Sequence, residues 1–283
     1  MIIMNIKILS DSTCDLSADI LAKHDITLMP LTVIKDDVSY LDNVTITPAE
    51  IFAHVEAGGA LCSTTAVSIG EYQDFFAPFA EKYDAVVHIN LGSGFSSSYQ
   101  NACLAAEEFD NVITIDSQNL STGQGLVVLE ACRLAKTTQS LEQLKADLIA
   151  FTDRVEASFL VDKLTYLVKG GRCSSAAALG ANLLNLKPCI EVKNGKMTVV
   201  KKYRGTYSKC LASYVKDRLA DREDLDNSTL FVTQTKVSDE CYAAVMEAVN
   251  TYGNFETVYE TVAGCTISCH CGPGTLGILF VRK

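Results

Sequence analysis

Short apolar runs alternate along the first half of the chain with stretches that begin in helix-capping residues. Runs such as Ile6–Leu9, Val86–Leu91 and Val112–Ile115 are typical of strands. A strand followed by a polar loop and a capped helix, repeated, predicts a parallel sheet with helices on its faces. Helix starts are predicted near Ser17, at the capping boxes Thr47-Pro48-Ala49-Glu50 and Ser68-Ile69-Gly70-Glu71, at Ser97 and at Ser121.

The pattern changes past residue 155. A short helix over Leu164–Val168 is expected to stop at Gly170-Gly171. Asn194-Gly195 lies between two apolar runs and predicts a tight hairpin, because both turn positions tolerate positive φ. Further helix–strand units follow, and the last apolar run is Leu276–Val281. We therefore expect an α/β protein of two domains, with a parallel-sheet domain over 1–155 and a smaller mixed α+β domain over 156–283.

Composition and charge narrow the class of protein. Hydrophobic residues make up 48% of the 283 residues and charged residues 20%, which is enough for a buried core and argues against disorder. The formal net charge is -10, and the 24 Lys and Arg are interpreted as scattered. We therefore expect no nucleic-acid partner and no resting place on an anionic membrane. No run reaches about 18 apolar residues, so no stable membrane insertion is expected.

The cysteines and the first residues indicate a cellular setting. Eleven cysteines, an odd number, include several within apolar runs, which is typical of reduced thiols that act as small hydrophobic residues. The first residues lack a cationic segment and a cleavage site, and they continue into a polar loop at Ser10. This beginning is typical of a first strand rather than a signal peptide, so we expect a cytoplasmic protein.

Hydroxyl side chains gather in loops of the predicted parallel-sheet region. The loops after parallel strands meet at one edge of the sheet, where ligands bind. Hydroxyls and free helix N–H groups can hold an oxygen-bearing anion without requiring a positive charge. The alternative is that each Ser or Thr only caps a helix, worth about 1 kcal/mol, although most of these loops carry more hydroxyls than one cap needs. The loops are 10–13, 63–65, 96–98 and 116–117.

A histidine between two cysteines, Cys269-His270-Cys271, lies just before a Gly-Pro-Gly turn. Such a cluster suggests zinc or a thiol nucleophile. In the extended strand expected here, however, the two cysteines point to the face opposite His270, and no second ligand cluster has metal spacing. We therefore expect no metal. His270 is either a structural histidine or one that faces a ligand, because the glycines after it permit close backbone approach.

Two further features have simple alternative explanations. The G-x-G-x-x-G at 272–277 runs into an apolar, strand-like segment instead of a helix, so we expect no dinucleotide cofactor. Arg172 follows Gly170-Gly171, and Arg204 precedes Gly205. The simplest interpretation of either arginine is a solvated surface charge.

Five motifs in the same order resemble the DegV family of bacterial fatty-acid-binding proteins, and the similarity runs nearly end to end. Residues 64–68 keep the first Thr and last Ser of the family's T-S-Q-P-S, and 96–98 replace its S-G-T by three serines. Cys269 and Cys271 replace the usual neighbours of the histidine. The motifs are Asp11–Leu16, Ser96–Ala102, Asp116-Ser117 with Gly123–Gly125, Leu164–Arg172 and His270–Gly274.

The resemblance implies a two-domain fold with a lipid tunnel and a fatty-acid carboxylate held near the loops between the domains. By position, Thr64 and Ser96 would hydrogen-bond the carboxylate, with His270 beside them and Arg172 nearby. Arg204 would match a surface arginine that engages a separate fatty-acid kinase. The carrier then performs no chemistry itself and needs no cofactor. The implied ligand-binding residues are Thr64, Ser96, Ser97, Ser98, Arg172 and His270.

The free energy of burying a carboxylate is compatible with a fatty-acid carrier but leaves two other functions open. Burying a carboxylate costs several kcal/mol unless it is hydrogen-bonded and preferably paired with charge. Two hydroxyls, helix N–H groups and a protonated His270 would offset that cost, and each buried CH₂ adds about 0.8 kcal/mol. The first alternative is an acyl transferase or hydrolase with Ser96 as nucleophile, His270 as base and Asp11 or Asp116 orienting the base. The second is a metal or redox protein built on Cys265–Cys271.

Overall fold

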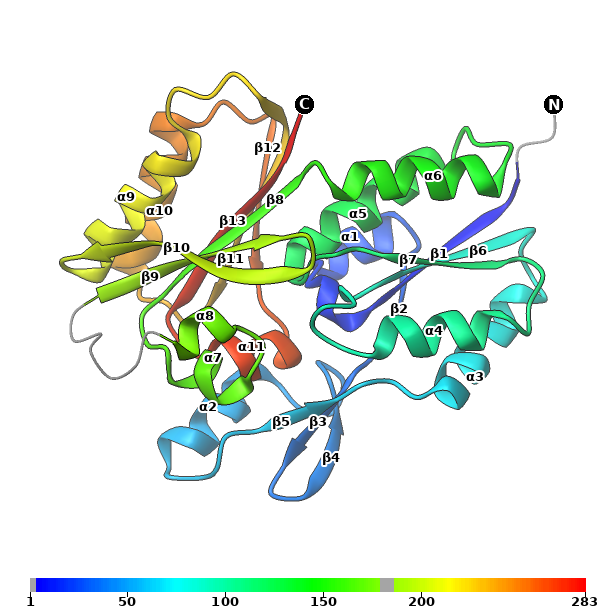
Figure 1. Cartoon of the computed structure of the whole chain (residues 1–283), viewed down its shortest axis with the longest axis horizontal. Coiled ribbons are helices and arrows are strands. Elements are labelled where there is room, and N and C mark those ends of the chain that lie inside the picture. The colour runs from blue at the N-terminus through cyan, green and yellow to red at the C-terminus, as the bar shows by residue number, and fades with distance from the viewer. Residues whose placement is uncertain (1–3, 179–185) are drawn as a thin grey trace.

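A parallel sheet forms one layer of the molecule, as the sequence pattern predicts (Figure 1). The computed structural model describes residues 4–178 and 186–283. Helices α5 and α6 cover one face of the sheet, and α3 and α4 cover the other. The strands run in the order β2-β1-β6-β7, all parallel, with β1 at Ile6–Asp11, β2 at Thr27–Met29, β6 at Ala85–Asn90 and β7 at Val112–Asp116. The fold is of the predicted α/β class.

Capping boxes start two of the helices where the sequence predicts them. In α2 the Thr47 hydroxyl accepts from the Glu50 N–H while Glu50 accepts from the Thr47 N–H, and Ser68 and Glu71 repeat the arrangement in α3. The cap predicted at Ser121 is wrong: Ser121 is the first residue of α5 and donates instead to Asp15. The helices of this half are α1 Ala18–Lys23, α2 Pro48–Glu56, α3 Ile69–Ala80, α4 Ser98–Ala106, α5 Ser121–Leu134 and α6 Leu141–Thr152, after the 3-10 turn η1 at Ser12–Cys14.

A small antiparallel sheet that the sequence pattern does not predict lies beside the parallel one. Its order is β4-β3-β5, with β3 at Thr32–Lys35, β4 at Val38–Leu41 and β5 at Ser63–Thr65. Val33 of β3 and Phe52 of α2 pack against Cys265 and Cys269 of helix α11. The small sheet therefore ties β5 to the last helix of the chain.

The remaining strands form a mixed sheet in the order β10-β9-β8-β13-β11-β12, in which only β11 and β12 pair in parallel. Asn194 and Gly195 both have positive φ and turn the predicted hairpin between β9 and β10. Helices α9 and α10 pack on one face. The elements are β8 Val155–Val161, α7 Thr165–Gly170, α8 Ser174–Ala177, β9 Leu186–Lys193, β10 Lys196–Arg204, α9 Tyr207–Leu219, β11 Leu225–Thr235, α10 Asp239–Tyr252, β12 Thr257–Val262, α11 Cys265–Cys271 and β13 Thr275–Arg282.

Helix α5 lies between the two large sheets and joins their cores. It contacts β1 and β6 of the parallel sheet and β8, β11 and β13 of the mixed sheet. Its middle residues Leu126–Val128 are buried in the same apolar cluster as Leu9 on one side and Phe159 on the other. Among the residues described, no helix combines the length and apolar composition that a bilayer crossing needs.

The segment expected to be an extended strand around His270 is instead the helix α11. The alternation that places Cys269 and Cys271 opposite His270 therefore does not apply. Successive residues of a helix are about 100° apart, so the three side chains still diverge. No group of three or more His, Cys, Asp or Glu side chains in residues 4–178 and 186–283 is arranged to hold a metal ion.

The core that supports the parallel sheet gives a first test. Leu148 on α6 is fully buried, whereas its neighbour Ile149 is 48% exposed. We expect Leu148→Ala to lower the free energy of unfolding by about 2–5 kcal/mol, because it removes buried methyl groups and leaves a cavity. Ile149→Ala is the matched control and should change it by less than about 0.5 kcal/mol. Urea unfolding followed by circular dichroism measures both, and equal effects would contradict the packing of α6.

Candidate functional site

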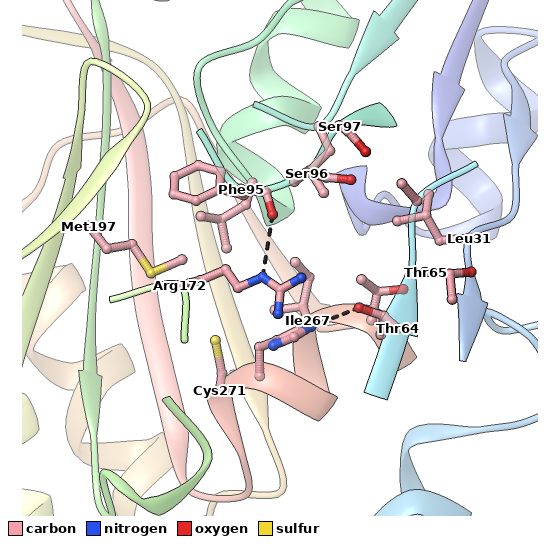
Figure 2. A pocket seen from close by; sticks show the side chains of 15 residues that line it. Leu31, Thr64, Thr65, Phe95, Ser96, Ser97, Arg172, Met197, Ile267 and Cys271 are labelled. Atoms are coloured by element: carbon pink, nitrogen blue, oxygen red, sulfur yellow. Dashed lines mark hydrogen bonds between the residues drawn. The ribbon is translucent and has the colours of Figure 1, made fainter. Parts of the chain in front are cut away.

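A cavity of about 190 Å³ opens where the small sheet, the loop after β6 and helix α11 meet (Figure 2). We call it the Thr64 cavity. Thr64 and Thr65 of β5 line one side, Phe95 to Ser97 line another, and Arg172 reaches in from the segment after α7. Residues from both halves of the chain therefore form its wall.

Thr64 and His270 meet in this cavity although 206 positions separate them in the sequence. The Thr64 Oγ1 lies 2.8 Å from the His270 Nε2, within hydrogen-bond distance. Thr64 is held by the pairing of β5 with β3, opposite Val33, and His270 lies in the last turn of α11. A Cβ at Gly170 would lie 2.7 Å from the His270 Nδ1, so only a glycine allows α7 to pack this closely on the ring.

His270 is neutral at physiological pH. Burial lowers the pKa of the imidazole to about 4, and the nearby Arg172 guanidinium acts in the same direction. The expectation that a protonated His270 offsets the charge of a buried carboxylate is therefore wrong. Arg172 is the cation of the Thr64 cavity instead.

The second ring nitrogen of His270 decides which way the Thr64 hydroxyl points. The Nδ1 is buried and has no hydrogen-bond partner among the residues described. An unpaired buried N–H is rarer in proteins than an unpaired acceptor, which favours the tautomer that carries its proton on Nε2. In that tautomer His270 donates to Thr64 Oγ1, and the single hydroxyl hydrogen of Thr64 is free for a ligand.

The three serines of the 96–98 loop have different positions. Ser96 and Ser97 line the Thr64 cavity. Ser98 is fully buried outside the cavity lining, and its backbone N–H donates to the Ser96 Oγ at 3.1 Å. The Ser98 hydroxyl lies 2.9 Å from the Ser96 hydroxyl and accepts from the Val67 N–H at 3.3 Å. Ser98 therefore holds Ser96 in place and ties the loop to Val67, in the segment after β5.

The two candidate arginines lie in different places. Arg172 donates through Nη1 to the Gly170 carbonyl at 2.7 Å and makes no salt bridge with any residue that the structure describes. Its guanidinium points toward Thr64 and Ile267 in Figure 2. Arg204 is exposed at the end of β10 and is not part of the cavity wall.

Asp11 fixes the loop that carries Ser96, a role that the sequence analysis missed. Its buried carboxylate accepts from the Tyr72 hydroxyl at 2.7 Å and from the Leu91 N–H at 2.8 Å, and it lies 2.9 Å from the His88 Nε2. Leu91 is the first residue after β6, so these bonds set where the loop begins. The position of Asp11 at the carboxyl end of β1 was the only signal in the sequence.

Two more buried carboxylates anchor α11. Asp15 accepts from the Gly264 N–H at 2.8 Å, and Asp42 accepts from the Cys265 N–H at 2.8 Å. A Cβ at Gly264 would lie 2.6 Å from the Asn43 Nδ2 and 3.0 Å from the Asp15 Oδ1, so the approach requires glycine. The first N–H groups of a helix have no partner inside the helix, and here carboxyl oxygens from the opposite end of the chain accept from the backbone where α11 begins.

A smaller cavity of about 30 Å³ adjoins the first and is lined almost entirely by apolar atoms. We call it the Phe159 cavity. Leu120, Ile267 and Cys271 line both cavities and lie between them. Its wall includes Phe159 of β8 and the inner face of the mixed sheet. Such residues resemble ordinary core in sequence, so the sequence analysis could not identify them.

The arrangement lacks the features of a Ser–His–Asp triad. His270 contacts Thr64 and makes no hydrogen bond to Ser96 among the bonds of the described residues. No carboxylate contacts the His270 Nδ1, which has no partner there. Asp11 is used by the β6 loop, and Asp116 accepts from the Ser93 hydroxyl at 2.6 Å. Burial also raises the pKa of the Cys271 thiol to about 12, which disfavours a thiolate nucleophile.

Comparison with known proteins gives the same family over nearly the whole chain. A family model described as "Uncharacterised protein, DegV family" matches residues 5–283. A DegV domain-containing protein of Clostridium acetobutylicum is 32% identical over 280 residues, covering 98% of this chain and 99% of the relative. A solved DegV family protein from Thermus thermophilus, described by its fatty-acid binding, matches with a TM-score of 0.91 and 31% identity over 99% of this chain and 100% of that one. A stearic-acid-binding protein from Eubacterium ventriosum matches with a TM-score of 0.84 and 29% identity over 98% of each chain.

The anchoring of α11 predicts a pH dependence of stability. Burial raises the pKa of Asp15 to about 8, outweighing the hydrogen bonds from Ser121 and Gly264. Between about pH 4, where an unfolded aspartate ionises, and pH 8, the folded state therefore keeps a proton that the unfolded chain has lost. Asp15 thus makes the free energy of unfolding fall as pH rises through this window.

Asp15→Asn should flatten this slope, because the amide has no proton to lose and its oxygen still accepts from Gly264. Urea unfolding between pH 4 and pH 8 measures the slope for the wild type, Asp15→Asn and the exposed control Asp19→Asn. The control should keep the wild-type slope. Identical slopes for the wild type and Asp15→Asn would show that Asp15 is ionised throughout.

Proposed function

The chain belongs to the DegV family, and from this premise we propose that it carries one long-chain fatty acid and presents the carboxylate to a separate fatty-acid kinase. The observation that carries the proposal is the contact between Thr64 and His270 at the wall of a cavity that adjoins an apolar one. The relatives from Thermus thermophilus and Eubacterium ventriosum, described as binding fatty acids, support the ligand class.

The carboxylate is held by neutral donors and one cation. Thr64 gives its hydroxyl hydrogen to one carboxylate oxygen, because the neutral His270 occupies the other side of that hydroxyl. Ser96, positioned by the Ser98 backbone, is the second donor from the opposite wall. Arg172 supplies positive charge without an acidic partner in the described part of the chain. Bonds to an ionised acceptor are about twice as strong as neutral ones.

The acyl chain extends from the Thr64 cavity into the Phe159 cavity. The two cavities, about 190 Å³ and about 30 Å³, together remain below the roughly 300–1,000 Å³ typical of ligand sites, so a long chain enters the Phe159 cavity only by displacing its apolar wall. Leu120, Ile267 and Cys271 form an apolar passage between the two. Each methylene buried there contributes about 0.8 kcal/mol, so the chain supplies most of the affinity and the carboxylate contacts supply orientation.

A carrier fits these residues better than an acyl transferase or hydrolase. Nucleophilic catalysis needs a base in contact with the nucleophile and a third group that orients the base. The described hydrogen bond of the His270 ring is to Thr64, and no carboxylate in residues 4–178 and 186–283 orients the ring, so the Ser96–His270 pair lacks both features there. We accordingly expect chemistry on the carried acid to come from the partner kinase, with no cofactor on this chain.

Arg204 and the surface around it provide the docking face for the kinase. Residues 186–222 hold ten of the 24 Lys and Arg of the chain but only three Asp and Glu, so the interpretation of the cations as scattered is wrong. Lys201, Lys202 and Arg204 are exposed along β10, the edge strand of the mixed sheet. A basic face on an otherwise acidic protein favours an acidic partner surface and steers its approach.

Mass spectrometry of an organic-solvent extract, together with metal analysis of the protein, tests the function directly. The purified protein should release about one fatty acid per chain. A protein that contains zinc and no lipid would overturn the proposal. Turnover of a nitrophenyl acyl ester that Ser96→Ala abolishes would establish the enzyme alternative instead.

The carboxylate contacts predict the effect of removing each hydroxyl. Thr64→Ala and Ser96→Ala should each weaken fatty-acid binding roughly 10- to 100-fold, because a hydrogen bond to a charged group is worth about 1.5–3 kcal/mol. Ser63→Ala, at an exposed position of β5 that does not line the cavity, is the control and should bind as the wild type does. Displacement of a fluorescent fatty acid from delipidated protein gives the affinities. Wild-type affinity in the Thr64→Ala, Ser96→Ala double variant would remove these hydroxyls from the site.

The docking face predicts a salt-dependent effect of charge reversal. Arg204→Glu should lower the rate at which the kinase phosphorylates the carried acid by about tenfold at low ionic strength, and less at high salt, because surface charges act on association and are screened. Arg133→Glu, an exposed arginine on α5, is the control. Phosphate transfer from ATP to the acyl carboxylate is the readout. An unchanged rate at low salt, with lipid occupancy intact, would place the kinase elsewhere.

A further inference from the structure

The wall of the Thr64 cavity contains a hydroxyl without a protein partner. Thr266 lies in the first turn of α11 and is only 4% exposed. Its Oγ1 makes no hydrogen bond to any residue that the structure describes, yet Thr266 lines the cavity. A buried polar group on a residue that lines a ligand site, with no partner in the described part of the chain, is a candidate contact for the ligand itself.

The free-energy cost of burying this hydroxyl without a partner suggests that it binds a ligand. A buried hydroxyl without a partner costs about 1–3 kcal/mol, and valine has nearly the same shape without that cost. A purely apolar wall at this position would be served better by valine.

Thr266 and His270 are four residues apart on α11, so their side chains lie on one face of the helix, about 6 Å apart along its axis. The carboxylate proposed above is already served by Thr64, Ser96 and Arg172. An oxygen that pairs with Thr266 therefore belongs to the acyl chain close to its carboxyl end, within one helical turn of His270.

We propose that Thr266 forms a second polar subsite that recognises a hydroxyl group on the second or third carbon of the bound fatty acid. The inference rests on the proposed fatty-acid binding and names the ligand class: 2- or 3-hydroxy fatty acids. A hydroxyl suits Thr266 because both groups can donate and accept, so either direction of the hydrogen bond satisfies the threonine.

Thr266→Val tests the subsite, because it removes the hydroxyl and keeps the shape. Delipidated wild type and variant are titrated with palmitate, 2-hydroxypalmitate and 3-hydroxypalmitate against a fluorescent fatty acid. The wild type should bind one of the hydroxy acids about tenfold more tightly, relative to palmitate, than Thr266→Val does. Palmitate should bind equally well to both proteins, or slightly better to the variant. Thr257→Val, an exposed threonine on β12 that lines neither cavity, is the control and should leave the preference unchanged.

The possible outcomes separate this inference from the function on which it rests. Equal weakening of all three acids by Thr266→Val would mean that Thr266 binds the carboxylate, and it would overturn the hydroxyl subsite alone. The same ratio of affinities in the wild type and the variant would also overturn it. Binding of none of the acids to the wild type would overturn the proposed function and the inference together. Because the variant loses an unpaired buried hydroxyl, its thermal midpoint should be no lower than that of the wild type.

Discussion

The site depends on buried carboxylates at the carboxyl end of β1 that hold its two walls together. Asp11 binds the backbone at the start of the loop that carries Ser96, and Asp15 binds the backbone at the start of α11, which carries His270. The anchors of these two elements, which are far apart in the sequence, are thus only four positions apart. Burying a polar group costs free energy unless it is hydrogen-bonded, and each of the two carboxyl groups accepts at least two hydrogen bonds.

Helix α11 links these anchors to the proposed ligand site. Its N-terminal residues meet Asp15 and Asp42, while its last turn places His270 against Thr64. Because His270 is buried and neutral, it directs the Thr64 hydroxyl and does not supply charge. The positive charge comes from the exposed Arg172. We infer that a carrier gains from this division, since the proposed carboxylate is oriented by half-buried groups while its charge is compensated near solvent.

Local signals in the sequence predict the parallel sheet, the capping boxes of α2 and α3, and the β9–β10 hairpin. They could not predict the β3–β4–β5 sheet, whose strands have at most four residues, or α11, whose seven residues include cysteines, threonine and isoleucine with weak helix preference. The meeting of Thr64 with His270 depends on tertiary contacts and was available only through family resemblance. The neutral state of His270 follows from burial, which no local pattern reveals. The basic character of 186–222 was readable from the sequence and was overlooked.

Carbon-13 NMR of bound palmitate labelled at its carboxyl carbon tests the central claim, that the carboxylate lies against Thr64 and Ser96 beside the neutral His270. A single carboxyl resonance, distinct from that of free palmitate, should move in Thr64→Ser and stay in place in Ser63→Ala. It should also remain unchanged as pH falls from 8 to 6, because the pKa of His270 lies near 4. A resonance that is indifferent to Thr64→Ser, or that follows a titration near pH 6.5, would contradict this account.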